Sequence, residues 1–280
     1  MNKYLIVTAD DFGLTESANK AIIDCFKGGI VRSVSLMANG NAFENAVQSL
    51  KQNAGISAGV HLTLVFERPV LGPNEIQSLV REDGRLFQTH NQFIKRYLAH
   101  KIRLKEVEDE LSAQISKIKD RGIDISHINS HQHLHVLPGI IEIVIGLAVK
   151  YRIKNIRVPL EWSYLSMSPN NLFLNILSLR AMKKIQKARL NCIDHFRGSS
   201  VSGHLTESSL LNFIMNCKEG VTEIMCHPTY IDEFYQKNYL PHYKRTGYKH
   251  EPLKEVAALT SKKIKEEIEK KGIKLIGFQR

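Results

Sequence analysis

Short runs rich in β-forming residues alternate with amphipathic stretches along the 280-residue chain. The short runs predict strands at 3–9, 31–38, 56–65, 125–130, 155–159, 221–227 and 273–278. Apolar residues at helical spacing predict helices at 15–26, 43–53, 104–122, 206–218 and 252–271, and another from Pro138 to about residue 151. We expect residues 66–100 to be irregular, while residues 166–190 form one long apolar segment with a basic second half.

This alternation of strands and helices predicts an α/β fold with a parallel sheet and crossover helices. About seven strands favour a parallel (β/α) barrel, complete or incomplete, over an open doubly wound sheet. The chain lacks GxGxxG after the first strand and lacks GxxxxGK[ST], so the usual support for nucleotide binding is missing. Without a repeat, linker or composition break, residues 1–280 are expected to form a single domain.

The composition is typical of a cytoplasmic globular protein. Apolar stretches such as 140–149 are shorter than the roughly 20 residues of a membrane span. The start, MNKYLIVTADDFG, lacks the long apolar region and cleavage site of a signal peptide. The four cysteines show no CxxC spacing, as expected for reduced thiols.

The net charge of +11 leaves nucleic acid, an anionic membrane surface and an acidic substrate as partners to consider. No DNA- or RNA-binding motif is present, so we expect no nucleic-acid partner. Residues 170–189 are apolar and then basic, which suits peripheral contact with an anionic membrane at its inner face. An ordinary packed helix with a basic exposed side explains the same pattern, and a homodimer is equally left open.

Polar side chains stand at the ends of five predicted strands, where active groups of such folds gather. They are the pair Asp10–Asp11, then His61, His131, Arg157 and His227.

Adjacent acids repel each other unless a positive group lies between them. A cap or turn before Gly13 is the structural alternative for Asp10 and Asp11. Neighbouring side chains at a strand end diverge, so one acid can bind a metal while the other faces the metal's water. For His61, flanked by apolar residues, the alternative is a core histidine. One carboxylate with two imidazoles leaves coordination positions open for water and substrate.

The stretch SHINSHQHLH (126–135) carries four histidines, of which His131 at the strand exit is the best-placed ligand. His133 and His135 lie in the following loop as candidates for contacts with a ligand histidine, substrate contacts or structural groups. His127 suits a structural role lower in the strand. Asn129 can hydrogen-bond to a ligand histidine and so orient its ring.

Pro228 pushes His227 towards an extended conformation at its strand end. An imidazole there is a suitable proton donor to a leaving group. Arg157 can hold a substrate oxygen or Asp10, and the alternative is a salt bridge to Glu161 or another acid.

Four motifs, TADDFG (8–13), GVHLTL (59–64), INSHQHLH (128–135) and EIMCHP (223–228), resemble those of the YdjC-like carbohydrate deacetylases. The resemblance extends over nearly the whole chain. Residues 67–87, 191–196 and 277–280 look closer to the hopanoid-biosynthesis-associated branch than to chitooligosaccharide deacetylase. The resemblance implies a distorted α/β barrel related to polysaccharide deacetylases.

It also implies hydrolytic removal of an acetyl group from an N-acetylated amino sugar, with a metal on Asp11, His61 and His131 and Asp10 as base. Magnesium is the ion implied by the family, whereas the donor set also suits zinc. The branch implies a glycolipid such as an N-acetylglucosaminyl hopanoid, and a chitooligosaccharide or another soluble N-acetyl sugar is the alternative.

Two other classes remain as rivals. A metal-dependent isomerase or aldolase uses similar ligands but needs a second acid or a lysine at the metal, and no lysine stands at a predicted strand end. A basic membrane- or nucleic-acid-binding protein without catalysis is the second rival.

Overall fold

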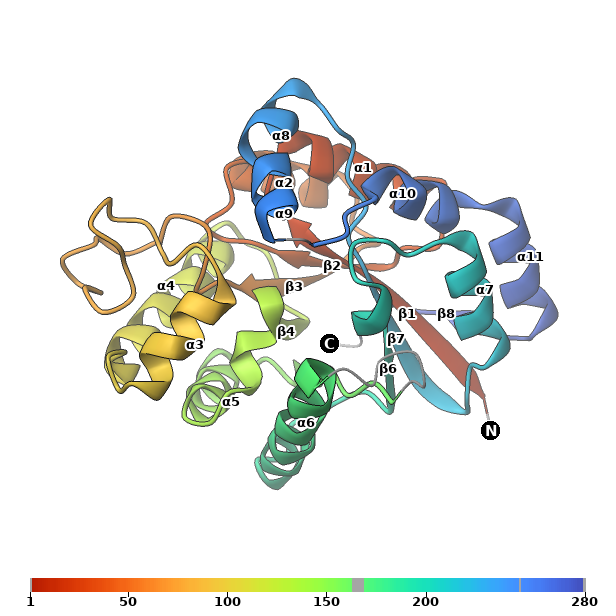
Figure 1. The fold of residues 1–280 in the computed structure, drawn as a ribbon. Coiled ribbons are helices and arrows are strands. Elements are labelled where there is room, and N and C mark those ends of the chain that lie inside the picture. Colours follow the sequence, from red (N-terminus) through yellow and green to blue (C-terminus); the bar gives the residue numbers. More distant parts are fainter. Residues whose placement is uncertain (1, 163–168, 247, 279–280) are drawn as a thin grey trace.

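A curled parallel sheet forms the centre of the computed structural model, which describes residues 2–162, 169–246 and 248–278 (Figure 1). Its strands are β1 (Lys3–Phe12), β2 (Ser33–Leu36), β3 (Ser57–Leu62), β4 (His127–Ser130), β5 (Asn155–Ile156), β6 (His195–Arg197), β7 (Gly220–Cys226) and β8 (Lys274–Leu275). Their order is β5-β4-β3-β2-β1-β7-β6, with β8 beside β1, and every ladder is parallel. The predicted α/β fold with an incomplete parallel barrel is confirmed.

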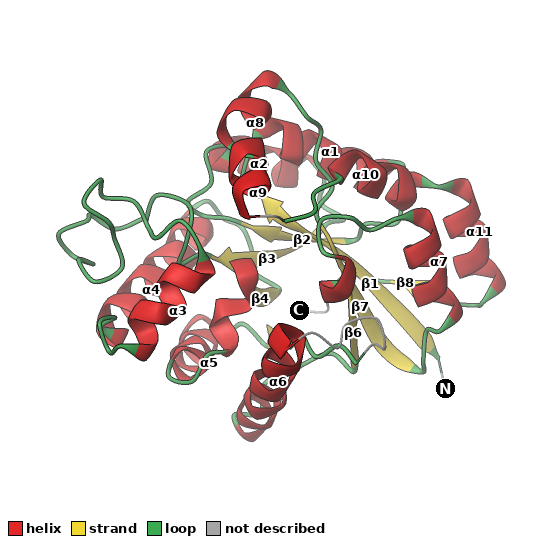
Figure 2. Ribbon diagram, in the orientation of Figure 1, coloured by secondary structure: helices red, strands yellow, loops and turns green. Residues whose placement is uncertain are grey.

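Helices surround the outside of this sheet (Figure 2). They are α1 (Glu16–Lys27), α2 (Phe43–Gln52), α3 (His90–Leu98), α4 (Leu104–Asp120), α5 (Ile140–Tyr151), α6 (Pro169–Lys187), α7 (Glu207–Met215), α8 (Glu233–Asn238), α9 (Leu240–Thr246), α10 (Pro252–Thr260) and α11 (Lys262–Lys270). Within the described residues, none of the helices combines the length and the apolar character that crossing a membrane requires.

Capping explains where the prediction of helices holds and where it is wrong. Thr15 caps α1 as expected, accepting a hydrogen bond from the Ala18 amide at 3.0 Å. The predicted irregular region contains α3, whose cap is Thr89. The single helix predicted at 252–271 is two helices, because Ser261 leaves the helical conformation and caps α11. The prediction also omits β6, α8 and α9, which are too short to show a periodic pattern.

The two faces of the sheet differ in polarity. Outward side chains such as Leu5, Val7 and Ala9 of β1 pack into the main hydrophobic core. The inner face is polar, and its residues are at most 2% exposed: Thr8, Asp10, Ser33, Ser35, His61, His127, Asn129, Arg157 and Glu223. Barrels of this class usually fill the interior with branched apolar side chains. Here a buried polar interior must be satisfied by its own hydrogen bonds.

His127 is fully buried in this interior, in the structural role that its sequence suggests. Its ring stacks on Phe278 at a centroid distance of 4.1 Å and hydrogen-bonds to Ser126 and Ser35. A Cβ atom on Gly59 would lie 2.3–2.4 Å from three atoms of this ring. Glycine is therefore required at position 59 because the imidazole occupies the space of a side chain.

Replacing Gly59 with Ala should consequently overpack the interior and lower the free energy of unfolding by about 1–3 kcal/mol. Gly146 of α5 is an exposed helical glycine with open space around it. Gly146→Ala, the matched control, should raise the free energy of unfolding by about 0.5–1 kcal/mol. Urea unfolding followed by circular dichroism measures both variants. Equal stabilities of Gly59→Ala and the parent protein would show that His127 can move aside.

Candidate active site

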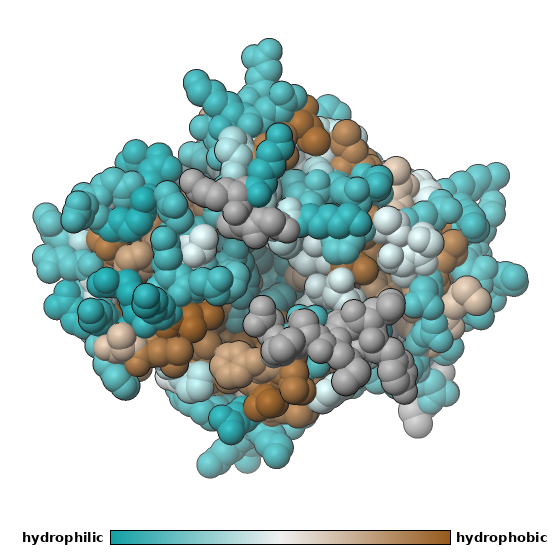
Figure 3. Space-filling view, in the orientation of Figure 1, coloured by the Kyte–Doolittle hydropathy of each residue, from teal (hydrophilic) through white to brown (hydrophobic). Residues whose placement is uncertain are grey.

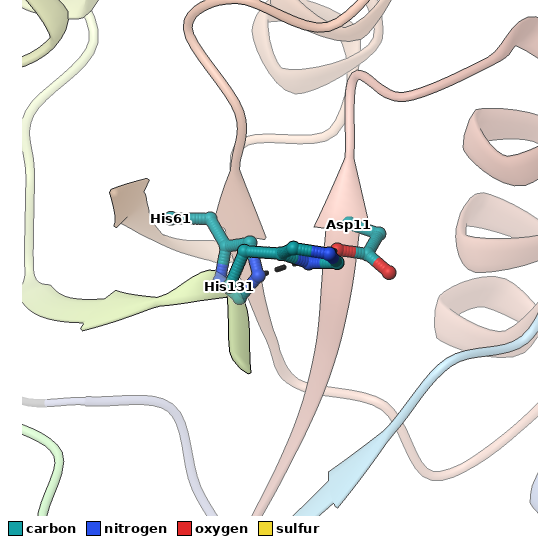
Figure 4. Close-up of side chains that lie close together, drawn as sticks. All are labelled: Asp11, His61 and His131. Atoms are coloured by element: carbon teal, nitrogen blue, oxygen red, sulfur yellow. Dashed lines mark hydrogen bonds and ion pairs between the residues drawn. The ribbon is translucent and has the colours of Figure 1, made fainter. Parts of the chain in front are cut away.

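Asp11, His61 and His131 converge at the carboxyl ends of β1, β3 and β4 (Figure 4). Asp11 Oδ1 lies 3.2 Å from His61 Nε2 and 3.1 Å from His131 Nδ1. One potential ligand atom from each residue lies within 4.8 Å of the other two. The structure thus brings together the three residues that the sequence suggests as metal ligands.

A backbone irregularity at the end of β1 separates the two adjacent acids. Asp11 adopts a left-handed conformation with φ of 60°, and the register with β2 shifts between Ala9 and Phe12. As a result, Asp10 contacts the buried interior while Asp11 contacts His61 and His131. Left-handed backbone is unfavourable for residues other than glycine and is often found at functional sites.

Asn129 determines which nitrogen of His61 carries a proton. The Asn129 amide oxygen lies 2.7 Å from His61 Nδ1, which must donate this hydrogen bond. In a neutral ring, Nε2 then presents a lone pair, and this buried atom has no hydrogen-bond partner among the described residues. A lone pair that faces a carboxylate oxygen at 3.2 Å is repulsive unless a cation or proton lies there.

Two ionisation tendencies support a cation site. Burial alone would raise the pKa of Asp11, but the imidazoles of His131 and His61 hold it well below its ordinary value. Burial alone would lower the pKa of His61, but the charges of Asp10 and Asp11 raise it. The pocket therefore favours positive charge between the imidazoles and the carboxylate, and a divalent metal ion fits the donor set.

A fully buried ion-pair triad lies beneath this group. The Arg157 guanidinium donates to both oxygens of Asp10, at 2.5 and 3.0 Å, and to Glu223 Oε1 at 2.7 and 3.0 Å. Arg157 therefore binds Asp10, one of the partners that the sequence suggests, and an acid other than Glu161, namely Glu223. Glu161 instead accepts hydrogen bonds from Ser200.

Burial would raise the pKa of Asp10, but the Arg157 guanidinium outweighs this effect and holds it below its ordinary value. Asp10 is therefore ionised at neutral pH.

Glu223 is a site residue that the sequence motifs do not single out, although the motif EIMCHP contains it. The available signal is an acid within the apolar strand β7. Its register partner on β1 is Ile6, so Glu223 lies four residues deeper than the level of Asp10 on the same inner face. A charged residue so deep in a parallel strand needs a buried partner, which Arg157 provides.

The remaining histidines differ in how their rings are used. His135 is buried, with Nδ1 2.6 Å from Ser130 Oγ and Nε2 2.9 Å from the Arg157 carbonyl oxygen. Both ring nitrogens are thus engaged within the protein. His133 lies edge-on to Phe196 in a backbone with φ of 56°, and its Nδ1 has no hydrogen-bond partner among the described residues.

His227 follows β7, and its backbone N–H donates to Glu255 at 2.5 Å. Its ring Nδ1 is buried and likewise lacks a hydrogen-bond partner in the described part of the chain. Burial lowers the pKa of His227 although Asp11 and Asp10 act in the opposite direction. The ring is therefore neutral at rest and its protonated form is a stronger acid than an exposed imidazolium.

The profile of the YdjC-like proteins matches residues 4–270. The chain belongs to the YdjC-like family. Relatives of this family member include a carbohydrate deacetylase of Thermoanaerobacter pseudethanolicus, 32% identical over 234 residues that cover 82% of this chain and 83% of the relative. A carbohydrate deacetylase of Listeria monocytogenes is 31% identical, with 98% of both chains covered.

A crystal structure from Enterococcus faecalis, provisionally described as a cellobiose-phosphate cleavage protein, matches this YdjC-like chain with a TM-score of 0.81. The two chains are 29% identical, and the match covers 99% of this chain and 98% of the other. The family and the fold implied by the sequence motifs are thus confirmed, whereas the hopanoid-associated branch stays a prediction.

The buried His135 gives this family member a testable dependence of stability on pH. Burial lowers the pKa of His135 to about 4 from an ordinary value of 6.5. Between these values the unfolded chain binds more protons, so the contribution of His135 is lost as the pH falls. By about pH 5 the loss is roughly 2 kcal/mol, at about 1.36 kcal/mol per pKa unit.

We expect the parent protein to lose roughly 2 kcal/mol more than His135→Gln between about pH 7.5 and about pH 5 in urea unfolding. The comparison with the variant removes the contributions of other titrating groups. Parallel losses in the two proteins would contradict a buried neutral imidazole at position 135.

Proposed function

We propose that this protein is a metal-dependent carbohydrate deacetylase that hydrolyses the acetamide of an N-acetylated amino sugar. The observation that carries the proposal is the convergence of Asp11, His61 and His131 next to the ion-paired Asp10. The relatives named carbohydrate deacetylase support the same reaction class.

In this proposal Asp11, His61 and His131 hold a divalent ion, and the unpartnered Nε2 of His61 is the observation that favours one. When bound, such an ion polarises a carbonyl group and acidifies a water molecule. The family resemblance implies magnesium, whereas two imidazoles with one carboxylate are a donor set that zinc prefers.

Asp10 takes the proton of the attacking water in the proposed reaction. Arg157 contacts both Asp10 oxygens and so fixes the orientation of the carboxylate. Because Glu223 binds the other side of the guanidinium, its charge offsets part of the pull that Arg157 exerts on Asp10. Arg157 is fully buried between two acids, so its role is to hold the base rather than to contact substrate.

His227, which is neutral at rest, takes up a proton from the solvent and gives it to the departing amine as the water oxygen bonds to the acetyl carbon and the carbon–nitrogen bond breaks. Asp10 then releases to the solvent the proton that it took from the water. The lowered pKa of His227 makes the protonated ring a strong donor. The products are acetate and a free amino sugar. His133, whose Nδ1 is unpartnered within the described residues, is the proposed substrate contact among the remaining histidines.

Removing two imidazole ligands tests this reaction directly. With N-acetylglucosamine-bearing substrates and added zinc or magnesium, the double variant His61→Ala/His131→Ala should release acetate at the background rate. Asp10→Asn should slow acetate release by about 10²–10⁴-fold, the usual contribution of a general base. His100→Asn, which changes an exposed histidine with left-handed backbone, is the control. Full activity of the double variant would refute the proposal.

A lipid-linked sugar is the finer proposal for the substrate. The first half of α6 exposes Leu172, Phe173 and Ile176, and its second half carries exposed basic residues, Arg180, Lys183, Lys184 and Lys187. The side chain of residue 170, at the start of this segment, lies outside the described residues. Figure 3 shows apolar side chains below the central hollow, at the position of α6 in Figure 1.

This arrangement supports peripheral contact with an anionic membrane, which would bring a glycolipid to the site. A soluble sugar is the alternative substrate. The cytoplasmic location, the single domain and a homodimer stay predictions from the sequence.

Vesicles that contain phosphatidylserine test the membrane contact. The parent protein should bind them in a sedimentation assay, and Lys183→Glu/Lys184→Glu/Lys187→Glu should bind at least roughly tenfold more weakly, since each surface cation contributes about 1 kcal/mol. Vesicles without anionic lipid are the control. No binding by the parent protein would exclude the contact and favour a soluble substrate.

A further inference from the structure

A continuous line of hydrogen bonds extends across the inner face of the sheet to the proposed metal ligands. Ser126 Oγ lies 3.0 Å from His127 Nδ1, and His127 Nε2 lies 3.2 Å from Ser35 Oγ. Asn129 Nδ2 then donates to Ser35 Oγ at 2.7 Å and to Asp10 Oδ1 at 3.0 Å. Asn129 thus connects Ser35 with both Asp10 and His61.

The direction of these bonds follows from the chemistry of the groups. Ionised Asp10 only accepts, so the Asn129 amide nitrogen must face it and the amide oxygen must face His61. Ser35 accepts the second amide hydrogen of Asn129. Both hydrogens of the amide are therefore used, and its orientation is fixed from two sides.

His127 completes this arrangement from below. The Ser126 hydroxyl donates to the Ala58 carbonyl oxygen at 2.9 Å, so Ser126 accepts from His127 Nδ1. Burial and the Arg157 charge lower the pKa of His127 to about 3, which keeps this ring neutral. A neutral ring that donates from Nδ1 accepts at Nε2, so the Ser35 proton points to His127 and its lone pairs to Asn129.

We propose that Ser35 is a positioning residue that fixes the Asn129 amide and, through it, the tautomer of His61 and the orientation of Asp10. The inference rests on the proposed metal site. Without the Ser35 oxygen, one buried amide hydrogen of Asn129 loses its acceptor. Asp10 alone then holds the amide, and in the fraction of molecules whose amide rotates the nitrogen faces His61 Nδ1, the imidazole proton moves to Nε2, and the lone pair directed at Asp11 is lost.

Ser33 provides a matched control on the same strand. It has the same inward direction and is fully buried like Ser35, but its hydroxyl donates to the Ser57 carbonyl oxygen at 3.3 Å, and the amide hydrogens of Asn129 go to Ser35 and Asp10 instead. A purely structural role of buried serines predicts similar effects of Ser33→Ala and Ser35→Ala. A positioning role predicts that only Ser35→Ala changes the metal site.

The experiment measures zinc dissociation constants by competition with a chelating dye, together with the urea stability of the zinc-free proteins. Loss of a partner that orients a metal ligand typically weakens metal binding by about 10- to 100-fold. Because Ser35 acts through Asn129, we expect the lower end of that range, about tenfold, in Ser35→Ala, a smaller loss in Ser35→Cys, whose thiol is a weaker acceptor, and a change within about twofold in Ser33→Ala.

Nitrogen-15 spectra of the histidine rings in zinc-free protein at alkaline pH provide a second readout. His61 should be protonated on Nδ1 in the parent protein and in Ser33→Ala, and should populate the other tautomer in Ser35→Ala. Equal zinc affinities and equal His61 spectra in both serine variants would overturn the role of Ser35 but leave the proposed metal site in place. A folded parent protein that binds no zinc would overturn the proposed metal site and this inference with it.

Discussion

The buried ion pairs of Arg157 constrain the whole structure. Arg157 follows β5, the first strand in the sheet order, yet it contacts Asp10 on β1 and Glu223 on β7, four and five positions further along. These contacts are possible only because the sheet curls until the edge with β5 faces the strands near the opposite edge. A guanidinium that is fully buried from solvent needs carboxylate partners, since an unpaired buried charge costs several kcal/mol. The curl and the triad therefore depend on each other.

The polar interior that results explains the geometry above it. The triad keeps Asp10 ionised, ionised Asp10 orients the Asn129 amide, and Asn129 directs the His61 lone pair towards Asp11. Each group thus helps to fix the next through a hydrogen bond of defined direction, and Ser35 accepts the second amide hydrogen of Asn129. The proposed metal site is the open end of this network, at the carboxyl edge of the sheet.

Much of the fold and of the candidate metal site can be predicted from the sequence, because strands, helices and the polar residues at strand ends each form recognisable local patterns. Asp11, His61 and His131 each lie at or near the carboxyl end of a strand that the sequence predicts, where parallel strands bring side chains together. Ser35 leaves no such signal, and Glu223 leaves only that of an acid within an apolar strand, since a polar residue inside a strand shows its role only when the register places it against a partner. Likewise, the two-helix structure around Ser261 depends on a cap that a continuous helical pattern conceals.

The proposed metal site can be observed directly by X-ray absorption or anomalous diffraction from zinc-loaded protein. We expect one ion per chain, about 2.0–2.2 Å from an Asp11 carboxylate oxygen and from one imidazole nitrogen each of His61 and His131. We also expect His61 to coordinate through Nε2 while its Nδ1 stays hydrogen-bonded to Asn129. An ion held elsewhere, or by His61 Nδ1, would show that the metal site proposed here is wrong.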